Sequence, residues 1–492
     1  MTPDAEWLSD PKWINAAKLI YHFSDRCKFV FTIEPLCRLR KNCLPLAFGH
    51  LFSVGDQDSY AVVAPKDDID KLPLAWIKDL EKLHVHFADD VFFAATNLQM
   101  SSTISTAYDI RGEMEYGYSR RSKILNGIRV RRDRLLDDAT LPHDTPYCLI
   151  INAALTDNAG DVLLAQSAIR LITEAAPHLH CIVADPEIDR VTVANASLIV
   201  IGPGGILYDL DDHDRLAVNH SNIAAYFRFA FMAYEYGVPF GLLGIGSPAP
   251  ILSSYSRHFL REALRHAKFF HLRDPRSLAT VSDAFSVKAP TIVTPDVSIA
   301  FQEEVRAAAR NRADRKVLIA CGSFNLDTVA EVAHKCHLDL RIVVQATEDA
   351  HWLEANRDKL NSLMLSAEIV DVRGAPLSEF IDAVATGDCV LSARFHAMMV
   401  GIMAELPTVA VGVHNDKRHR VKQDLGEYAN LTFINSHETT DEEFVVLCCE
   451  RFLGEANPDA TARFSAKDLA PLRELLRAAI APAQPAVHPL QL

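Results

Sequence analysis

The stretch DCVLSARFHAMMVGIMAELPTVAVG, residues 388–412, contains one complete strand–helix–strand unit. The apolar run CVLSA predicts a buried strand, and AMMVGIMA is so uniformly apolar that it predicts a helix packed inside a core. PTVAVG, led by a proline, predicts the next strand. Short apolar strands that alternate with helices are typical of a parallel sheet with crossover helices on its faces.

The same alternation runs from about residue 147 onward in two successive series. The first series has strand candidates at residues 147–153, 180–185, 197–203, 239–246, 268–274 and 291–296. After a charged helical stretch at 303–315, the second has strand candidates at residues 316–322, 340–345, 368–372, 389–393 and 407–412. The pattern predicts an α/β fold with two Rossmann-like lobes, residues 146–305 and 306–435, and a ligand cleft between the carboxyl ends of their strands.

The two ends of the chain differ from the lobes. Residues 1–145 carry short mixed patterns that predict a small α+β extension, which ends in a linker-like segment at 140–146. The basic stretch at 119–134 fits either a solvated helix face or a contact for an anionic lipid-linked acceptor or a partner subunit. Residues 436–492 predict C-terminal helices followed by a disordered, proline-rich tail.

The composition excludes some partners. The 492 residues carry a formal net charge of −14, which argues against binding of nucleic acid or of anionic membranes. An anionic ligand must then be held by a local cluster of Arg, Lys or helix N-termini. The start lacks a signal-peptide pattern, and the most apolar helix candidate, at 223–236, is too short to cross a bilayer. With ten scattered cysteines, these features predict a cytoplasmic protein without a transmembrane segment.

Two strand ends carry cationic side chains. Arg394 and His396 follow the strand at 389–393, where Arg supplies paired donors for phosphate or carboxylate and His can exchange a proton near neutrality. The alternative is a solvated Arg and a core His. Arg273 ends the strand at 268–274, and Asp274 or Ser277 could begin the next helix. The alternative for Arg273 is a salt bridge to a neighbouring carboxylate.

The segment TDNAGDVLL, at 156–164, directly follows the first strand of the first lobe. Gly160 permits a tight turn, and Asp157 or Asn158 could cap the following helix, whose N-terminus would favour an anion. The alternative is an ordinary strand–turn–helix with a capping residue.

Glycine-rich strand ends occur twice more in the first lobe. IGPGGILYD contains Gly204 and Gly205, and GLLGIGSPAP contains Gly246. These glycines would let backbone amides approach a ligand, although turns that require glycine are an equal alternative. Neither segment is a P-loop or a GxGxxG dinucleotide motif.

Taken in order, these segments resemble the polysaccharide pyruvyl transferase family over residues 147–433. The motifs that carry the resemblance are N-x-G-D at 158–161, GPGG at 202–205, G-x-G at 244–246, RDPRS at 273–277, PD at 295–296 and SARFHA at 392–397. The resemblance implies a glycosyltransferase-B-like fold. It also implies transfer of the pyruvyl group of phosphoenolpyruvate to a sugar as a cyclic ketal, with a sugar or lipid-linked glycan as acceptor.

The resemblance further implies that Arg273, Arg394 and His396 lie at the phosphoenolpyruvate site, with Lys417 as an added cation. The sequence departs from the family where His414 and Asn415 stand in place of an aromatic residue.

We assign roles to the titratable residues on chemical grounds. His396 is the expected acid, and Asp161 or Asp296 is the expected base that deprotonates the sugar hydroxyl. Asn158, Gly160, Gly204, Gly205, Gly246 and Ser277 complete the expected substrate-binding set. No cofactor besides the co-substrate is expected, and no metal, because a site built from His84, His86, Asp89 and Asp90 is the weaker interpretation.

Two other functions fit the same fold. One is a nucleotide-sugar-dependent glycosyltransferase, for which Asp416 is the only clear carboxylate near the end of the second lobe that could hold a ribose. The other is a non-catalytic sugar- or phosphate-binding protein whose N-terminal extension covers the cleft. The sequence does not identify the acceptor sugar. It also does not determine the oligomeric state, and a homo-oligomer is one alternative.

Overall fold

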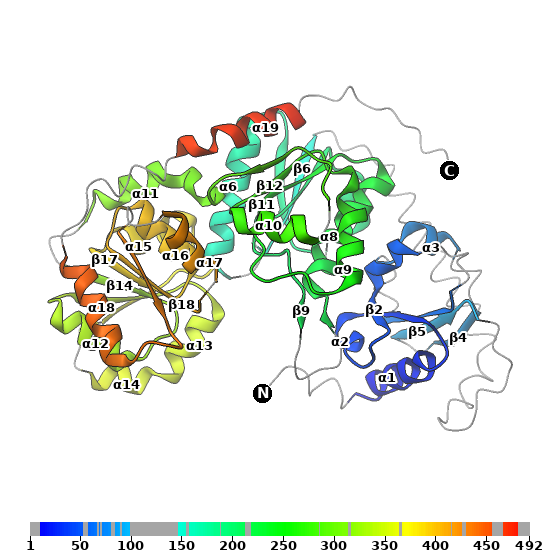
Figure 1. Cartoon of the computed structure of the whole chain (residues 1–492), viewed down its shortest axis with the longest axis horizontal. Coiled ribbons are helices and arrows are strands. Elements are labelled where there is room, and N and C mark those ends of the chain that lie inside the picture. The colour runs from blue at the N-terminus through cyan, green and yellow to red at the C-terminus, as the bar shows by residue number, and fades with distance from the viewer. Residues whose placement is uncertain are drawn as a thin grey trace.

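The computed structural model describes three bodies in a row: an N-terminal unit, a first lobe and a second lobe (Figure 1). The described residues are 10–52, 58–65, 68, 71–79, 84–88, 91–98, 146–153, 157–186, 188–211, 218–284, 286–312, 316–363, 367–414, 416–425, 430–454 and 466–480. The basic stretch at 119–134, nearly all of the linker at 140–146, Asp89, Asp90, Asn415 and the C-terminal tail lie outside them.

The first lobe is a six-stranded parallel sheet with strand order β13-β12-β11-β8-β6-β7. Its strands are β6 (Tyr147–Ile151), β7 (His180–Ala184), β8 (Leu198–Ile201), β11 (Phe240–Ile245), β12 (Phe270–Leu272) and β13 (Thr291–Val293). A small antiparallel pair, β9 (Leu210–Asp211) and β10 (Val218–Asn219), follows β8. The strand order reverses between β6 and β8, and such a reversal opens a crevice at the carboxyl ends of the two strands.

Helices follow the strands of the first lobe. They are α6 (Ala159–Ala175), α7 (Arg190–Ala194), α8 (Ser221–Tyr236), α9 (Ser254–Ala263), η6 (Leu264–His266), α10 (Pro275–Ala284), η7 (Val297–Phe301) and α11 (Gln302–Ala309). The longest, α6, begins where the side chain of Asn158 accepts a hydrogen bond from the amide of Gly160, a cap for the free N–H groups of the first turn.

The second lobe repeats this architecture with the Rossmann strand order β16-β15-β14-β17-β18-β19, all parallel. Its strands are β14 (Val317–Cys321), β15 (Asp339–Val344), β16 (Ala367–Asp371), β17 (Cys389–Ser392), β18 (Thr408–Gly412) and β19 (Leu431–Asn435). Its helices are α12 (Leu326–Lys335), α13 (Thr347–Ala355), α14 (Arg357–Ser362), α15 (Leu377–Ala385), α16 (Phe395–Met403), α17 (Lys417–Leu425) and α18 (Asp441–Leu453). The chain therefore has the predicted α/β fold with two Rossmann-like lobes.

One hydrophobic core joins the two lobes. It contains Leu163 and Leu164 of α6, Val297 of η7, and Met398 and Met399 of α16, all of them buried. Helix α16 is the uniformly apolar segment of the sequence, and it packs against both α6 and η7 of the first lobe. Since burial of apolar area is the main stabilising contribution in folding, this shared core fixes one lobe against the other.

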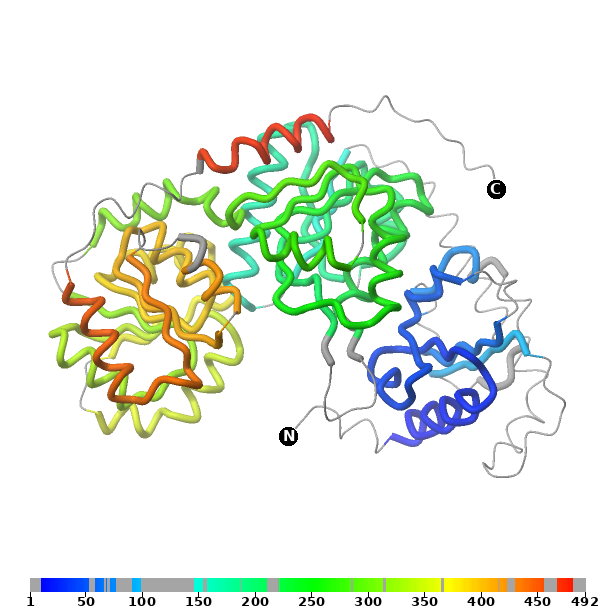
Figure 2. Tube along the Cα trace, viewed as in Figure 1, coloured from blue at the N-terminus to red at the C-terminus, as the bar shows by residue number. Residues whose placement is uncertain are grey.

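The C-terminal segment divides between the lobes. Helix α18 packs against α12 of the second lobe, whereas η10 (Ala466–Leu469) and α19 (Ala470–Ile480) return to the first lobe and cover α6 (Figures 1 and 2). Arg473 of α19 pairs with Glu174 of α6 at 2.7 Å. None of the helices in the described ranges has the length and hydropathy that a bilayer-spanning segment needs.

The N-terminal unit is a mixed five-stranded sheet in the order β2-β1-β3-β5-β4, flanked by helices. Its elements are α1 (Pro11–Ser24), β1 (Phe29–Thr32), α2 (Glu34–Cys37), β2 (Cys43–Pro45), η3 (Leu46–Leu51), β3 (Tyr60–Pro65), α3 (Leu74–Asp79), β4 (His84–Ala88) and β5 (Phe92–Thr96). The extension is thus α+β, as predicted.

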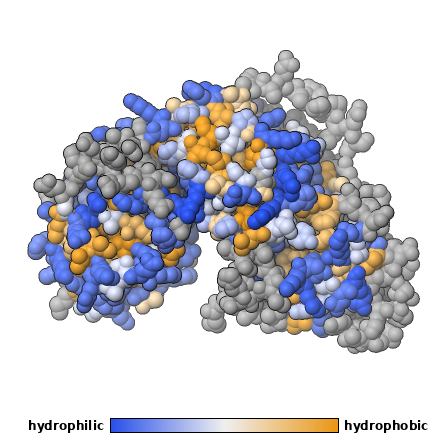
Figure 3. Space-filling view, in the orientation of Figure 1, coloured by the Kyte–Doolittle hydropathy of each residue, from blue (hydrophilic) through white to orange (hydrophobic). Residues whose placement is uncertain are grey.

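This unit shares a core with the first lobe. Phe48 of η3 stacks on Phe259 of α9 with ring centroids 4.5 Å apart, and both side chains are buried. The unit lies on the side of the first lobe away from the second lobe, and a notch separates it from the second lobe in the space-filling view (Figures 1 and 3). The idea that the extension covers the cleft between the lobes therefore does not apply to the described residues.

A buried ion pair holds the N-terminal unit to the first lobe. Arg190 of α7, whose side chain is 1% exposed, donates to the Glu235 carboxylate of α8 at 2.8 Å. Arg190 also donates to the Leu72 carbonyl, and the same carboxylate accepts from the Leu74 amide at 3.0 Å. The Glu235 carboxylate therefore accepts hydrogen bonds both from the first lobe and from the N-terminal unit.

We predict that Glu235→Ala lowers the free energy of unfolding by about 3–5 kcal/mol, because it leaves the Arg190 guanidinium buried without its counter-ion. Chemical denaturation of the full chain measures the change. Glu331→Ala is the control, since the pair of Glu331 with Lys335 is half exposed and should add almost nothing to stability. Equal stabilities for the two variants would contradict the assigned role of Glu235.

Candidate active site between the lobes

The carboxyl ends of the two sheets meet at the junction of the lobes. The Ala159 amide, in the first turn of α6, donates to the Gln345 carbonyl after β15 at 2.9 Å. Arg420 of α17 donates to the Ser247 and Pro248 carbonyls after β11, at 2.7 and 3.2 Å. These contacts bring the predicted site residues of the first lobe against those of the second.

Arg273 and Asp296 form the buried ion pair of the site. They follow β12 and β13, their Nη1 and Oδ2 atoms are 3.3 Å apart, and both side chains are almost fully buried. Asp296 also accepts a hydrogen bond from the Ser298 amide at 3.0 Å. Burial by itself raises the pKa of Asp296, but the charge of Arg273, the influence of His396 and the hydrogen bonds from Ser298 together outweigh it and hold that pKa below its usual value. Asp296 is therefore ionised.

The alternative considered for Arg273, a salt bridge to a neighbouring carboxylate, is correct only for its Nη1 atom, which pairs with Asp296. Among the described residues, Nε and Nη2 of Arg273 have no hydrogen-bond partner. That edge of the guanidinium has the two parallel donors that match a carboxylate or a phosphate.

Two of the predicted glycines make room for Arg273. A Cβ atom on Gly246 would lie 2.3 Å from Nε of Arg273, and one on Gly205 would lie 3.3 Å from its Nη2. The first distance is far below van der Waals contact, so the guanidinium lies directly on the backbone of Gly246. Gly204 has another role, because its amide donates to the Gly244 carbonyl at 3.2 Å and ties the glycine-rich loop to β11.

His396 lies in the first turn of α16 with its ring buried at the junction. Gly160 of the first lobe faces it so closely that a Cβ there would lie 2.5 Å from its Nδ1. The Nε2 atom is buried and has no partner among the described residues. Burial lowers the pKa of His396 to about 3, so the imidazole is neutral without a ligand. The charge of Asp296 opposes this shift.

Lys417, the first residue of α17, brings a second cation to the junction. Its Nζ lies 5.2 Å from the centre of the Phe395 ring, and the Arg273 guanidinium lies 4.9 Å from the same centre. Burial, followed by the charges of Arg273 and Arg418, lowers the pKa of Lys417 to about 8. No side chain in the described ranges makes a hydrogen bond or a salt bridge with Lys417.

Asp161 completes the cluster from the first turn of α6. Burial raises the pKa of Asp161 to about 6, against the opposing effect of Lys417, Asn158, Arg273 and Arg394. A carboxyl with such a pKa exchanges a proton in the range where general acids and bases operate. Of the two carboxylates considered as the base, Asp161 is thus the one that can gain and lose a proton near neutral pH.

Arg394 lies at the edge of the cluster and is already engaged. Its Nε and Nη2 donate to the Asp349 carboxylate of α13 at 2.9 and 2.6 Å, and Nη2 also lies 3.3 Å from Glu348. Only Nη1 has no partner among the described residues. The expectation that Arg394 offers a two-donor grip is therefore wrong for this arrangement, because Asp349 occupies one edge of the guanidinium.

Ser277 has a positioning role. Its hydroxyl donates to Asp274 at 2.8 Å and accepts from the Ser247 amide at 2.8 Å, which anchors the loop after β11 to the start of α10. Asn158 is used in a comparable way as the cap of α6. Ser277 and Asn158 therefore position the backbone around the site.

Two residues of the site were not predicted from the sequence. Phe395 stands inside the SARFHA motif, and two cationic groups, those of Arg273 and Lys417, lie 4.9 and 5.2 Å from its ring centre. Asp349 follows β15 in the segment QATEDA. An acidic residue in the first turn after a strand of the same sheet is the signal that could have identified Asp349 as a partner for Arg394.

The described residues contain no cluster of three or more His, Cys, Asp or Glu side chains arranged to hold a metal ion. His84 and His86 belong to β4 of the N-terminal unit, away from the junction of the lobes.

We predict that Gly246→Ala moves the Arg273 side chain off Asp296 and costs about 1–3 kcal/mol of stability, as expected for overpacking of a buried site. Gly205→Ala is the matched control, because its Cβ has a larger distance to Arg273 and should cost less. A crystal structure and a denaturation curve of each variant measure both effects. An unchanged Arg273–Asp296 pair in Gly246→Ala would refute this account of the glycine.

Solved structures are similar to this chain at TM-scores below 0.5. They include a putative UDP-N-acetylglucosamine 2-epimerase from Listeria monocytogenes (TM-score 0.46, 10% identity, 67% of this chain and 95% of that chain covered). Another is the UDP-GlcNAc 2-epimerase from Neisseria meningitidis bound to UDP-GlcNAc (0.45, 9%, 68% and 100%). A third is the ADP-heptose LPS heptosyltransferase II of E. coli (0.35, 12%, 62% and 98%). At these values nothing about activity follows from the likeness.

The comparison with curated proteins found no match. A family model described as polysaccharide pyruvyl transferase matches residues 158–415, more than half of the chain. The matched range begins at the cap of α6 and ends just before Lys417, so it covers Asp161, Arg273, Asp296 and His396. The chain belongs to the polysaccharide pyruvyl transferase family.

Proposed function

We propose that the cluster at the junction of the lobes binds phosphoenolpyruvate and transfers its pyruvyl group to two hydroxyls of a sugar. The observation that carries the proposal is a group of polar atoms in one cluster that have no hydrogen-bond partner among the described residues. They are the Nε–Nη2 edge of Arg273, Nζ of Lys417 and the fully buried Nε2 of His396. The two cationic groups attract an anion, and a partner for Nε2 removes the free-energy cost of leaving that atom buried and unpaired.

The charge of the cluster suits this ligand. Asp296 neutralises part of Arg273, and Lys417 keeps its proton at neutral pH because its pKa, though lowered, is about 8. Phosphoenolpyruvate carries a carboxylate and a phosphate, so it needs one two-donor site and at least one further cation. Arg273 supplies the first and Lys417 the second, with Nη1 of Arg394 at the edge.

His396 is the proposed acid. The imidazole is neutral in the free protein, and the approach of a multiply charged anion raises its pKa because a negative charge favours the imidazolium. Protonation of His396 therefore follows substrate binding. The histidine then delivers the proton to the methylene carbon of phosphoenolpyruvate.

The reaction balances with the residues at hand. The methylene carbon gains one proton and becomes a methyl group, and the central carbon develops oxocarbenium character. Two sugar oxygens bond to that carbon, the bond from carbon to the phosphate oxygen breaks, and inorganic phosphate leaves. Of the two hydroxyl protons, one is taken up by phosphate and the other restores the acid. Asp161 is the proposed base for the first hydroxyl.

The nucleotide-sugar alternative gains no support from Asp416. One of its carboxylate oxygens lies 2.5 Å from Nη2 of Arg418, and the other accepts from the amides of Arg418 and His419 at 2.8 and 3.0 Å. The carboxylate considered for a ribose is thus used to begin α17.

We predict that His396→Gln lowers kcat/KM for phosphate release from phosphoenolpyruvate by about 10²–10⁴-fold, as expected for loss of a general acid. The assay is phosphate release in the presence of a panel of sugar acceptors, with mass spectrometry to detect the pyruvylated sugar. The melting temperature should stay within a few degrees, and Lys335→Ala, far from the junction, is the control. Full activity of His396→Gln would exclude it as the acid.

Lys417→Met should separate stability from ligand binding. The lowered pKa of Lys417 means that burial of the ammonium destabilises the fold by about 3 kcal/mol. The penalty is fully present below pH about 8 and disappears as the pH rises toward the ordinary value of 10.5. The variant should therefore melt higher than the native chain at pH 7, yet lose most of the stabilisation that phosphoenolpyruvate gives. A lower melting temperature, or undiminished stabilisation by phosphoenolpyruvate, would contradict the role of Lys417.

The affinity of the protein for phosphoenolpyruvate should fall as the pH rises through about 8, because Lys417 then loses its proton and one cation of the site is lost. Lys417→Arg keeps its charge at higher pH, so the fall in affinity should move to higher pH in this variant. The rise in melting temperature with phosphoenolpyruvate, followed across a pH series, measures the effect. A fall in affinity that stays at the same pH in Lys417→Arg would assign it to another group.

A further inference from the structure

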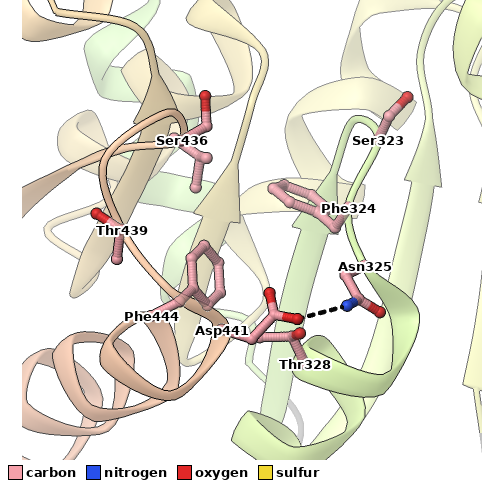
Figure 4. Close-up of a pocket in the computed structure, with 9 residues that line it drawn as sticks. Ser323, Phe324, Asn325, Thr328, Ser436, Thr439, Asp441 and Phe444 are labelled. Carbon is pink, nitrogen blue, oxygen red and sulfur yellow. Dashed lines mark hydrogen bonds between the residues drawn. The ribbon is translucent and has the colours of Figure 1, made fainter.

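A second hollow lies in the second lobe, outside the cluster between the lobes. It has a volume of about 190 Å³ and lies at the carboxyl ends of β14, β18 and β19, beside the N-terminal ends of α12 and α18 (Figure 4). Its lining residues are Ser323, Phe324, Asn325, Thr328, Val411, Ser436, Thr439, Asp441 and Phe444. We call it the lobe-2 pocket.

The lobe-2 pocket lies on the opposite face of the sheet from His396. Alternate residues of β14 face different cores: Leu318 and Ala320 pack with α12 and α18, whereas Val317, Ile319 and Cys321 pack with α15 and α16. Val411, which lines the pocket, belongs to the first of these cores. The pocket is therefore distinct from the Arg273–His396 cluster.

Its walls combine two aromatic rings with uncharged polar groups and one carboxylate. Phe324 and Phe444 face the hollow from different walls, and the Asp441 carboxylate lies between them (Figure 4). Asn325 donates to that carboxylate at 3.0 Å, which fixes both side chains. Within the described part of the chain, the second oxygen of Asp441 and the hydroxyls of Ser323, Thr328 and Thr439 have no hydrogen-bond partner.

The pocket does not suit an anion. No Lys, Arg or His lines it, and its one charged residue is acidic. The two helix ends already have caps: Asn325 accepts from the Asp327 amide, and Thr440 and Glu443 form a capping box at the start of α18. The N–H groups that would otherwise attract phosphate are thus partly satisfied.

The size of the pocket limits which ligands it can bind. Sites for drug-sized ligands run to about 300–1,000 Å³, so 190 Å³ accommodates a single ring with its substituents and not a nucleoside diphosphate. The ligand must offer several hydroxyls to the Asp, Asn, Ser and Thr side chains and apolar C–H faces to the two rings. We infer that the lobe-2 pocket binds one neutral hexopyranose unit of a carbohydrate.

The position of the pocket suggests what this unit does. Cys321 of β14 pairs in register with Ser392 of β17, so the pocket opens one strand away from the segment that carries Arg394 and His396. A glycan anchored in the pocket could extend along the sheet edge toward the cleft. Its identity as the acceptor rests on the proposed function, whereas the binding of a pyranose does not.

Binding of methyl hexopyranosides to the full chain tests the inference without any turnover. Saturation-transfer NMR with gluco-, galacto- and manno-configured glycosides and N-acetylglucosamine, each at millimolar concentration, should show transfer to the ring protons of at least one. Asp441→Ala and Thr328→Val should each weaken that binding at least tenfold. Glu442→Ala, next to Asp441 on α18 and outside the pocket, should leave the dissociation constant unchanged.

The outcomes separate this inference from the proposed function. His396→Gln should bind the glycoside normally, because His396 lies on the other face of the sheet. Glycoside binding without pyruvyl transfer would thus support the pocket and refute the proposed reaction. The pocket assignment would be overturned if no glycoside bound, or if a glycoside bound equally well to Asp441→Ala. Displacement of the bound glycoside by inorganic phosphate or UDP would also overturn it.

Discussion

Positive charge buried where two parallel sheets meet is the constraint on which the rest of this protein depends. Arg273 comes from the first lobe and Lys417 from the second, and both lie against the ring of Phe395. A buried cation destabilises a fold unless carboxylates or a ligand compensate for it. Asp296 compensates for Arg273 by contact, whereas Lys417 has no hydrogen-bond or salt-bridge partner in the described part of the chain. The surrounding structure must therefore supply the stability that the cluster lacks.

That stability comes from apolar cores that cross the boundaries of the lobes. Helix α16 carries His396 on its first turn and buries its methionines against α6 and η7 of the first lobe. The packing that stabilises the junction thus also sets the distance between Gly160 and His396. On the other side of the first lobe, Phe48 and the Arg190–Glu235 pair join the N-terminal unit to it. Buried contacts thus join the three bodies, and the elements that carry the site belong to the same cores.

The two faces of the second lobe have different chemistry. The face that packs on the first lobe contributes His396 and Lys417 to a cationic cluster, while the face under α12 and α18 forms a pocket with two phenylalanine rings, uncharged polar groups and one carboxylate. Successive side chains of a parallel strand point to opposite faces, so one sheet edge can present two unlike environments a strand apart. A substrate with a small anionic part and a larger neutral part would match this division.

The sequence by itself determined the fold and most members of the site. Apolar strands that alternate with helices predicted both lobes, and because the carboxyl ends of parallel strands meet at one edge, it followed that Asp161, Arg273, Asp296 and His396 would lie together. The family resemblance added Lys417 to this set. Only the tertiary structure decided how these residues are paired: Arg273 with Asp296, Arg394 with Asp349, and Gly246 beneath a guanidinium. It also decided that His396 is neutral and that the N-terminal unit shares a core with the first lobe. Periodicity shows which face of a strand or helix is buried. The partner of a side chain and the pKa of a buried group depend instead on residues far away in the chain, which only packing brings into contact.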